Sequence, residues 1–158
     1  MRRAFAKILQ HEMEANDRVV LLTADLGYGM FNEISLKFPN RFHNIGAAEQ
    51  AMVGIAVGMA LAGKIPICYS ITPFLLYRPF ELIRNYLSGE SVPVKLVGSG
   101  RDRDYVHDGP THWAEEDKKC LSCLSGLRTY WPESIDELLR VSRDFFDNNK
   151  PTYLNLRR

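Results

Sequence analysis

Short apolar segments alternate with helix-length segments along the whole chain, and this alternation limits the fold more than any other feature. Residues 18–25 (RVVLLTAD) form an apolar run that ends in polar residues, as buried parallel strands do. The segment before it places Phe5, Leu9 and Met13 at helical spacing. Strands separated by helix-length crossovers form parallel sheets with helices on their faces. The sequence therefore predicts an α/β fold with a doubly wound, mostly parallel sheet flanked by helices.

The rest of the chain repeats this order without an internal repeat, a linker or a low-complexity segment. A length of 158 residues suits one domain with a hydrophobic core, so we expect a single domain over residues 1–158. A Ser134/Glu137 pair forms a capping box before the last helix. The further expected strands are 41–46, 65–70, 92–100, 127–132 and 151–158, and the expected helices are 4–17, 30–39, 47–62, 73–87, 113–124 and 134–149.

The composition argues against several classes of partner. The formal net charge is +1, so nothing predicts binding to nucleic acid or to a membrane surface. No apolar run is long enough to span a membrane without polar breaks. The first residues (MRRAFAKILQHEMEAND) include acidic side chains and lack the apolar core of a signal peptide. Three cysteines without an even framework fit a reducing compartment, so we expect a cytoplasmic protein.

Unusual polar residues follow the expected strands at their carboxyl ends, where ligands bind in such sheets. Asp25 follows the first strand, and Glu49 follows the second within IGAAEQAMVGIAVGMALAG. Glu49 has no basic partner within reach along its own helix, although the rest of that helix is apolar or small. The pattern fits a functional carboxylate, and it fits equally an acid favoured by the helix dipole.

An aromatic series begins the helix expected at 73–87. Phe74, Tyr77 and Phe80 are spaced three residues apart and lie on one face of a helix. Flat side chains of this kind could pack around a flat heteroaromatic ligand. They could also form an ordinary core stripe together with Leu76 and Ile83.

Two further groups of residues admit a functional and a structural interpretation. Arg78 and Arg84 lie on the same helix and could meet a phosphate or carboxylate of a substrate, or form surface or intersubunit contacts. Cys120 and Cys123 could form a zinc site together with two upstream histidines, or a redox pair on their own. The spacing is unusual for zinc, and packing of two small residues at a helix interface is the expectation we favour.

Three stretches resemble the pyrimidine-binding domain of transketolase-like thiamine diphosphate enzymes, a group that includes transketolase, deoxyxylulose-phosphate synthase and shorter split relatives. They are RFHNIGAAEQAMVGIAVGMALAGKIPICYS, PFLLYRPFE and DGPTHWAEED. The resemblance runs in order from about Ala4 to the end of the chain. It implies the thiamine diphosphate-binding fold, with residues 1–158 as one pyrimidine-binding domain.

The resemblance also implies a role for Glu49. In this family a glutamate contacts N1′ of the cofactor aminopyrimidine and shares a proton with it. The 4′-imino tautomer that results removes the proton from C2 of the thiazolium ring. A dry site that raises the proton affinity of the carboxylate suits this task.

Other candidate site residues are carried over by their positions in the matching motifs. Histidine in the Gly-Pro-Thr-His motif faces the substrate in the family, whereas a loop histidine could simply bind its acidic neighbours. An aspartate after the first strand lies close to the cofactor, although strand-end aspartates also cap loops. The resemblance thus implies catalytic Glu49 and His112, cofactor-binding Asp25, Glu49, Phe74, Tyr77 and Phe80, and no metal ligand in this chain.

Half of such an active site is missing from the sequence. In the family, a diphosphate-binding domain with a Gly-Asp-Gly motif holds Mg²⁺. Neither that motif nor the C-terminal transketolase domain occurs here. We therefore expect the small subunit of a two-chain enzyme, as an α2β2 heterotetramer, whose partner holds Mg²⁺. The reaction would be ketol transfer between sugars or carboligation from a 2-oxo acid.

Two alternatives stay open. One is a subunit of a split thiamine diphosphate 2-oxo acid decarboxylase, and the other is a non-catalytic binding or regulatory homologue. The charged residues 101–104 depart from the family pattern and leave the substrate open.

Overall fold

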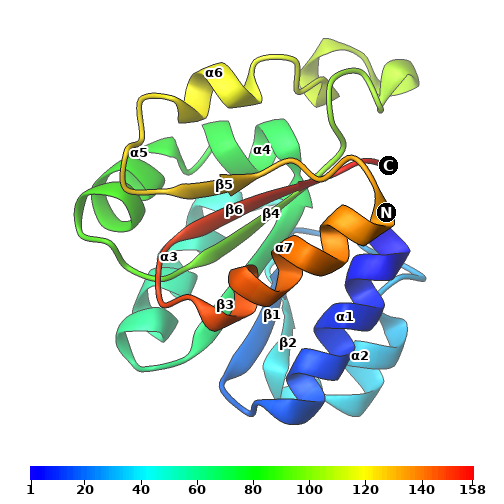
Figure 1. Ribbon diagram of the computed structural model, residues 1–158, viewed down its shortest axis with the longest axis vertical. Coiled ribbons are helices and arrows are strands. Elements are labelled where there is room, and N and C mark those ends of the chain that lie inside the picture. Colours follow the sequence, from blue (N-terminus) through cyan, green and yellow to red (C-terminus); the bar gives the residue numbers. More distant parts are fainter.

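Six strands form one sheet at the centre of the computed structural model, which describes residues 1–158 (Figure 1). Every neighbouring pair is parallel, as the sequence predicted. The strand order is β2-β1-β3-β4-β6-β5. The strands are β1 (Val19–Thr23), β2 (Phe42–Asn44), β3 (Ile65–Ile71), β4 (Lys95–Ser99), β5 (Arg128–Tyr130) and β6 (Thr152–Leu156).

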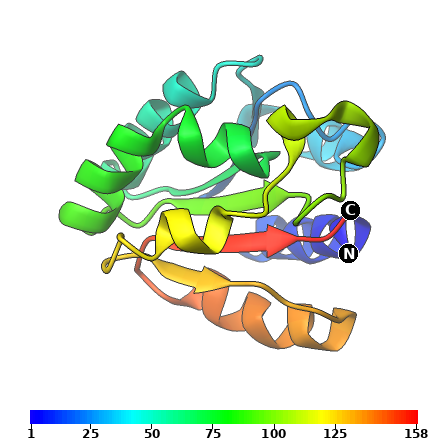
Figure 2. The same cartoon turned by 90° about the horizontal axis from the view of Figure 1, so that it is seen from above.

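Helices cover both faces of this sheet, which gives three layers (Figure 2). The first face carries α3 (Glu49–Leu61), α4 (Thr72–Tyr77), α5 (Phe80–Leu82), the π-helical segment η2 (Ile83–Gly89) and α6 (Asp117–Leu121). The second face carries α1 (Arg2–Ala15), α2 (Asn32–Lys37) and α7 (Ile135–Asp147), and α1 and α7 lie side by side (Figure 1). Short 3-10 turns complete the chain: η1 (Pro39–Arg41), η3 (Val106–Asp108) and η4 (Pro110–His112).

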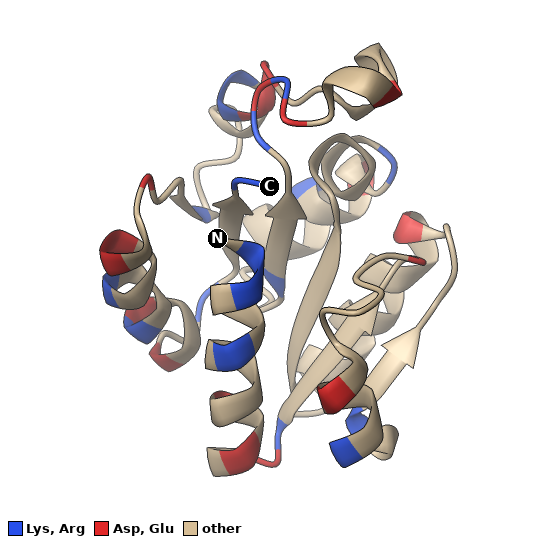
Figure 3. Ribbon diagram, turned by 90° about the vertical axis from the view of Figure 1, so that its right-hand side faces the viewer, with Lys and Arg blue, Asp and Glu red and all other residues tan.

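Two hydrophobic clusters, one on each face, form the core. Successive side chains of a strand point to opposite faces, so Leu96 joins the cluster under α3 and Val97 joins the cluster under α1 and α7. Every residue of β1, β4 and β6 is buried, as expected for parallel strands covered on both faces, and β1 accordingly reads as an apolar run. Charged side chains of both signs lie mostly on the helices and loops around this core (Figure 3).

One expected helix is broken in the structure. Residues 73–87 were predicted as a single helix, but α4 ends at Tyr77 and α5 begins only at Phe80. Pro79 lies between them, lacks a backbone N–H and clashes with a preceding turn. The aromatic series therefore does not share one continuous helix face.

Other expected elements are shorter than the sequence suggested. Only Asp117–Leu121 is α-helical within the expected helix at 113–124, because Trp113 is extended and Ala114 bridges back to Asp102. The capping hydrogen bond before α7 is confirmed, since Ser134 Oγ accepts from the Glu137 amide at 3.1 Å. The Glu137 carboxylate accepts from the amide before Ser134 rather than from that of Ser134 itself. No helix has both the length and the apolar character needed to cross a bilayer.

The topology places the candidate residues at one edge. The chain runs from β1 outward to β2 and then crosses β1 to reach β3, so the connections after β1 and β2 leave on opposite faces. The carboxyl ends of β1, β2, β3 and β4 meet at this edge, where ligands bind in open parallel sheets.

Candidate active site

Glu49 is the first residue of α3 and is buried, with 1% of its surface exposed. The chain turns from β2 into α3 through Gly46, whose φ of +77° lies in the left-handed region that favours glycine. Asn44 Oδ1 accepts from the Gly46 amide at 3.0 Å and fixes this turn. A short, rigid connection thus places the carboxylate at the carboxyl edge of the sheet.

Both carboxylate oxygens of Glu49 have a donor. Ser70 Oγ, near the end of β3, donates to Oε1 at 2.8 Å, and Arg78 Nη1 donates to Oε2 at 2.5 Å. No basic partner lies along α3 itself, and the partner comes from the α4–α5 connection instead. A buried carboxylate with this pairing avoids the large cost of an isolated buried charge.

Arg78 joins Glu49 to two ring side chains. Its guanidinium carbon lies 4.0 Å from the centre of the Phe74 ring, a cation–π distance. The Phe74 ring in turn meets the His112 imidazole edge-to-face, with centroids 4.9 Å apart. The structure therefore brings Glu49, Phe74 and His112 into one contiguous group, with Arg78 in its middle. This contact with Glu49 within the chain is neither of the roles considered for Arg78 from the sequence, which were a substrate contact and a surface or intersubunit contact.

A pocket of about 560 Å³ opens beside this group at the start of α3. Glu49 and Arg78 supply its charged lining, and three alanines leave it wide. Its walls are Ala47, Ala48, Glu49, Gln50, Ala51 and Arg78. The arrangement offers a held carboxylate to a small ligand from one side, next to the unpaired amides of the first helical turn.

His112 lies at the end of the loop that follows β4. Its amide donates to Gly109 O at 3.0 Å, and its Nδ1 is 3.0 Å from Thr111 Oγ1. The ring also lies 6.0 Å from that of Tyr105, measured between centroids. The imidazole is half-buried between two aromatic rings rather than paired with an acidic neighbour.

Tyr77 and Phe80 lie apart from this group. Tyr77 faces α6, where its partial burial and the nearby Glu116 carboxylate raise the pKa of the phenol. Phe80 packs against the hydrophobic cluster under α3. Of the three aromatic residues expected around the cofactor, only Phe74 lies beside Glu49 and its partner Arg78 in this chain.

Asp25 lies in the exposed turn after β1, with a φ of +52°. Tyr28 Oη donates a hydrogen bond to its carboxylate, and Asn44 Nδ2 donates a second at 3.3 Å. These bonds, the one from Tyr28 first, hold the pKa of the Asp25 carboxyl below its usual range. Asn44 serves both this turn and the turn before Glu49, so the two carboxylates are supported by one residue.

No group of three or more His, Cys, Asp or Glu side chains is arranged to hold a metal ion. Cys120 is half-buried, whereas Cys123 is exposed and donates through Sγ to the Cys120 carbonyl. Burial and the neighbouring Cys123 and Asp117 raise the pKa of the Cys120 thiol, which makes it a poor nucleophile. The histidine-cysteine zinc arrangement considered from the sequence therefore does not form.

The chain spans about half the length of the curated relatives that it matches. One relative is the 6-deoxy-6-sulfo-D-fructose transketolase subunit SqwH of Clostridium sp. (strain MSTE9). The sequence identity is 29%, and the alignment covers 100% of this chain and 49% of that relative. Another is a protein of Methanocaldococcus jannaschii described as "Putative transketolase C-terminal section". The sequence identity is 30%, and the alignment covers 100% of this chain and 50% of that relative.

A solved structure described as a split gene transketolase, inactive beta4 tetramer, has the same fold. The TM-score is 0.87 at 29% identity, over 99% of this chain and 50% of that one. Residues 1–158 also match the family described as "Transketolase, pyrimidine binding domain". Family, fold and motif order agree, and the chain belongs to the family of transketolase pyrimidine-binding domains.

Proposed function

We propose that this chain is the pyrimidine-binding subunit of a two-chain transketolase-like enzyme that uses thiamine diphosphate. The observation that carries the proposal is the Glu49 carboxylate, which is 1% exposed and nevertheless borders an open pocket. A structural carboxylate has no need of such a pocket, whereas a carboxylate that serves a ligand does.

The residues around the pocket fit the aminopyrimidine of this cofactor. Glu49 offers acceptor oxygens to a ring nitrogen, and Phe74 offers a flat ring close by. The alanines at 47, 48 and 51 leave room for a planar group. When bound, thiamine diphosphate supplies a nucleophilic carbon that can attack carbonyl groups.

In this proposal each residue of the chain has a limited task. Glu49 holds a proton at the ring nitrogen of the aminopyrimidine, while Ser70 keeps Oε1 in a fixed orientation. Phe74 excludes water from one side of the ligand. His112, which contacts Phe74, hydrogen-bonds substrate oxygens. Asp25 and Tyr77 lie apart from the Glu49 pocket in this chain, and a contact with the cofactor would need the partner chain to complete the site on their side.

The diphosphate and its Mg²⁺ would be held by a partner chain with a Gly-Asp-Gly motif. Two relatives support a split arrangement, because their names describe transketolase subunits, one acting on 6-deoxy-6-sulfo-D-fructose and one on apulose 4-phosphate. We propose an α2β2 assembly and transfer of a two-carbon ketol unit as the reaction. Carboligation from a 2-oxo acid is the related reaction that the same groups would serve, since relatives include 1-deoxy-D-xylulose-5-phosphate synthases.

Calorimetric titration of thiamine diphosphate with Mg²⁺ tests the proposal. The titration is made with this chain alone, with a candidate Gly-Asp-Gly chain alone, and with the two mixed. Binding that is tight only in the mixture supports a shared site and is followed by assays with ketose phosphates and 2-oxo acids. A mixture that forms a complex yet binds no cofactor contradicts the proposal and favours a non-catalytic homologue. Release of aldehyde and CO2 without carbon–carbon bond formation favours a decarboxylase.

A further inference from the structure

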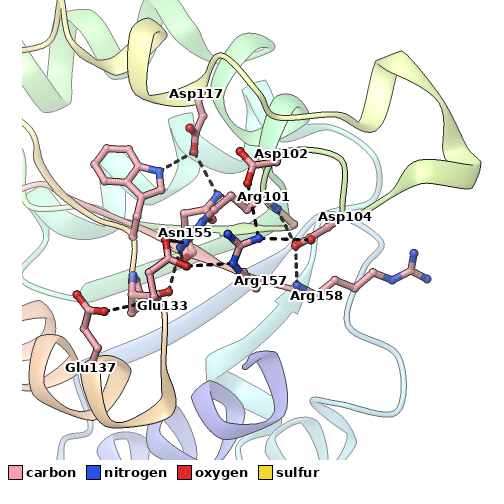
Figure 4. A network of polar contacts seen from close by, with 12 residues as sticks. Arg101, Asp102, Asp104, Asp117, Glu133, Glu137, Asn155, Arg157 and Arg158 are labelled. Carbon is pink, nitrogen blue, oxygen red and sulfur yellow. Dashed lines mark hydrogen bonds and ion pairs between the residues drawn. The ribbon is translucent and has the colours of Figure 1, made fainter.

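The loop between β4 and α6, residues 100–116, carries His112 toward Phe74 and is attached to the sheet in an unusual way. Its two ends converge on a single side chain, Asn155 in β6 (Figure 4). Asn155 is fully buried. Apart from Thr152, the other residues of β6 are apolar or aromatic. A polar residue at such a position is costly unless all its hydrogen bonds are made.

Arg101 forms the first attachment and is 2% exposed. Its Nε donates to Asn155 Oδ1 at 2.8 Å, and its Nη2 donates to Asn155 O at 3.2 Å and to Pro132 O at 3.1 Å. Its Nη1 donates to Glu133 Oε1 at 2.6 Å. The rigid guanidinium fork thus joins the start of the loop to β6 and to the connection after β5 (Figure 4).

Asp117 forms the second attachment, at the end of the loop, and is 3% exposed. Its Oδ2 accepts from Asn155 Nδ2 at 3.3 Å, from Tyr153 Oη at 3.1 Å and from Trp131 Nε1 at 2.8 Å. Asn155 Nδ2 also donates to Gly100 O at 3.1 Å. One amide side chain therefore holds both ends of the loop together.

Contacts inside the loop carry this constraint to His112. The Ala114 amide donates to Asp102 O at 2.7 Å, so the two arms of the loop are bridged near their base. Trp113 Nε1 donates to Tyr105 O at 3.3 Å, next to the imidazole. If the two ends of the loop move, these few hydrogen bonds transmit the movement to His112.

Packing alone does not account for these residues. Burial of the Arg101 guanidinium and of the Asp117 carboxylate costs each of them its hydration, and the hydrogen bonds they make offset that cost with little net stability to spare. A connected and satisfied polar network does select one arrangement over others. The network of Arg101, Asp117 and Asn155 therefore specifies a loop position more than it adds stability.

We propose that Arg101 and Asn155 are positioning residues that hold His112 against Phe74 in the geometry that the reaction requires. The inference rests on the proposed function for its effect on turnover, whereas its structural part applies to the isolated chain. Neither side chain contacts the pocket beside Glu49, so the cofactor affinity is independent of them.

Arg101→Met tests the proposal, with Arg128→Met as the matched control. Arg128 also forms an arginine–carboxylate pair, with Asp144 at 2.7 Å, but makes no hydrogen bond or ion pair with the loop. The first readout is the NMR shift of the His112 ring protons in the isolated chain, assigned with His112→Gln. The Phe74 ring current acts on these protons, so their shift reports the contact directly. The second readout is kcat in the reconstituted complex, together with the Kd of thiamine diphosphate.

For Arg101→Met we expect the His112 shift to move toward that of an unstructured peptide and kcat to fall about 10- to 100-fold. The cofactor Kd and the overall fold are expected to stay as in the wild type, and Arg101→Lys to restore part of kcat. Arg128→Met is expected to change neither readout.

Unchanged His112 shifts and unchanged kcat in folded Arg101→Met would overturn the proposal. If Arg101→Met does not fold, Glu133→Ala, at a largely exposed side chain, removes the ion pair with Arg101 Nη1 and is decided by the same two readouts. A wild-type complex without activity counts against the proposed function alone. The NMR comparison then still decides whether Arg101 positions His112.

Discussion

At the scale of single residues, Glu49 has surroundings that separate function from stability. Its partner Arg78 has 44% of its side chain exposed, so loss of the carboxylate leaves a cation that water can still solvate. Ser70 keeps its hydroxyl but loses one acceptor. The site can therefore lose the Glu49 carboxylate without losing the fold.

We expect Glu49→Gln and Glu49→Ala to remove activity from the reconstituted complex while the thermal unfolding midpoint changes little. The reason is that an amide or a methyl group cannot hold a proton at the ligand. Glu81→Gln, at an exposed position of α5, is the matched control and is expected to retain activity. Full activity in either Glu49 variant would remove the catalytic assignment.

Phe74 and Tyr77 are expected to respond differently to truncation. Phe74 borders Arg78 and His112, so Phe74→Ala should weaken cofactor binding by about 1 kcal/mol, or about 5-fold. Tyr77 faces Glu116 instead, so Tyr77→Ala should change the cofactor affinity less. Titration calorimetry of the reconstituted complex measures both. Equal losses in the two variants would show that the partner chain draws Tyr77 into the same pocket.

Local motifs predicted Glu49, Phe74 and His112 as candidate site residues, and the structure brings the three together through Arg78. Sequence reasoning did not identify Ser70 or Asn155, because their roles depend on partners far away in the chain. Polar residues inside otherwise apolar strands were the available signal for both, since a buried hydroxyl or amide needs a hydrogen-bond partner. The sequence could show that such partners exist but not which residues they are.

At the scale of elements, β5 is an edge strand that depends on side-chain contacts. It has three residues and pairs only with β6. Asp144 in α7 accepts hydrogen bonds from Tyr130 Oη and from Arg128 Nη1, which connects the strand to the helix that follows it. These bonds, the one from Tyr130 first, hold the pKa of the Asp144 carboxyl below its usual 3.8.

This pKa shift predicts how the stability of the molecule depends on pH. Because the pKa is lower in the folded than in the unfolded state, the stabilisation is complete above about pH 4 and is lost as pH falls through the folded-state pKa. Urea unfolding between pH 6 and pH 3 is expected to lose more stability in the wild type than in Asp144→Asn. Parallel pH profiles for the two proteins would contradict this prediction.

The N-terminus of α7 offers a second test at the same scale. Ser134 Oγ satisfies the Glu137 amide, so Ser134→Ala should lower the free energy of unfolding by about 1 kcal/mol. Ser125→Ala, at an exposed position outside the helices, is the control and should change it by less than about 0.5 kcal/mol. Urea unfolding monitored by circular dichroism measures both. A cap variant as stable as its control would mean that the Glu137 side chain compensates.

At the scale of the whole molecule, one sheet connects two separate hydrophobic clusters. Leu154 belongs to the cluster under α1 and α7, whereas its neighbour Tyr153 belongs to the cluster under α3. Because both clusters share every central strand, we expect them to unfold together. The alternation of strand and helix patterns predicted this layered arrangement. The same patterns could not predict the strand order β2-β1-β3-β4-β6-β5, because the order depends on which buried strands pack best together.

Leu154→Ala is expected to cost about 2–5 kcal/mol, because Leu154 is fully buried. In a Trp113→Phe background, the fluorescence of Trp131 reports on the opposite face, where it packs against the cluster under α3. The midpoint measured by this fluorescence should fall together with that measured by circular dichroism. Separate midpoints would show that the two faces unfold independently.

The attachment of the β4–α6 loop at its two ends has a consequence for protein engineering. Arg101, Asp117 and Asn155 hold the loop from inside the molecule, whereas residues 106–108 and 111 are exposed and make few side-chain contacts. A combinatorial library restricted to those exposed positions would keep its folding scaffold constant. If the chain has the proposed function, selection on such a library would sample substrate preference without first having to restore a damaged structure.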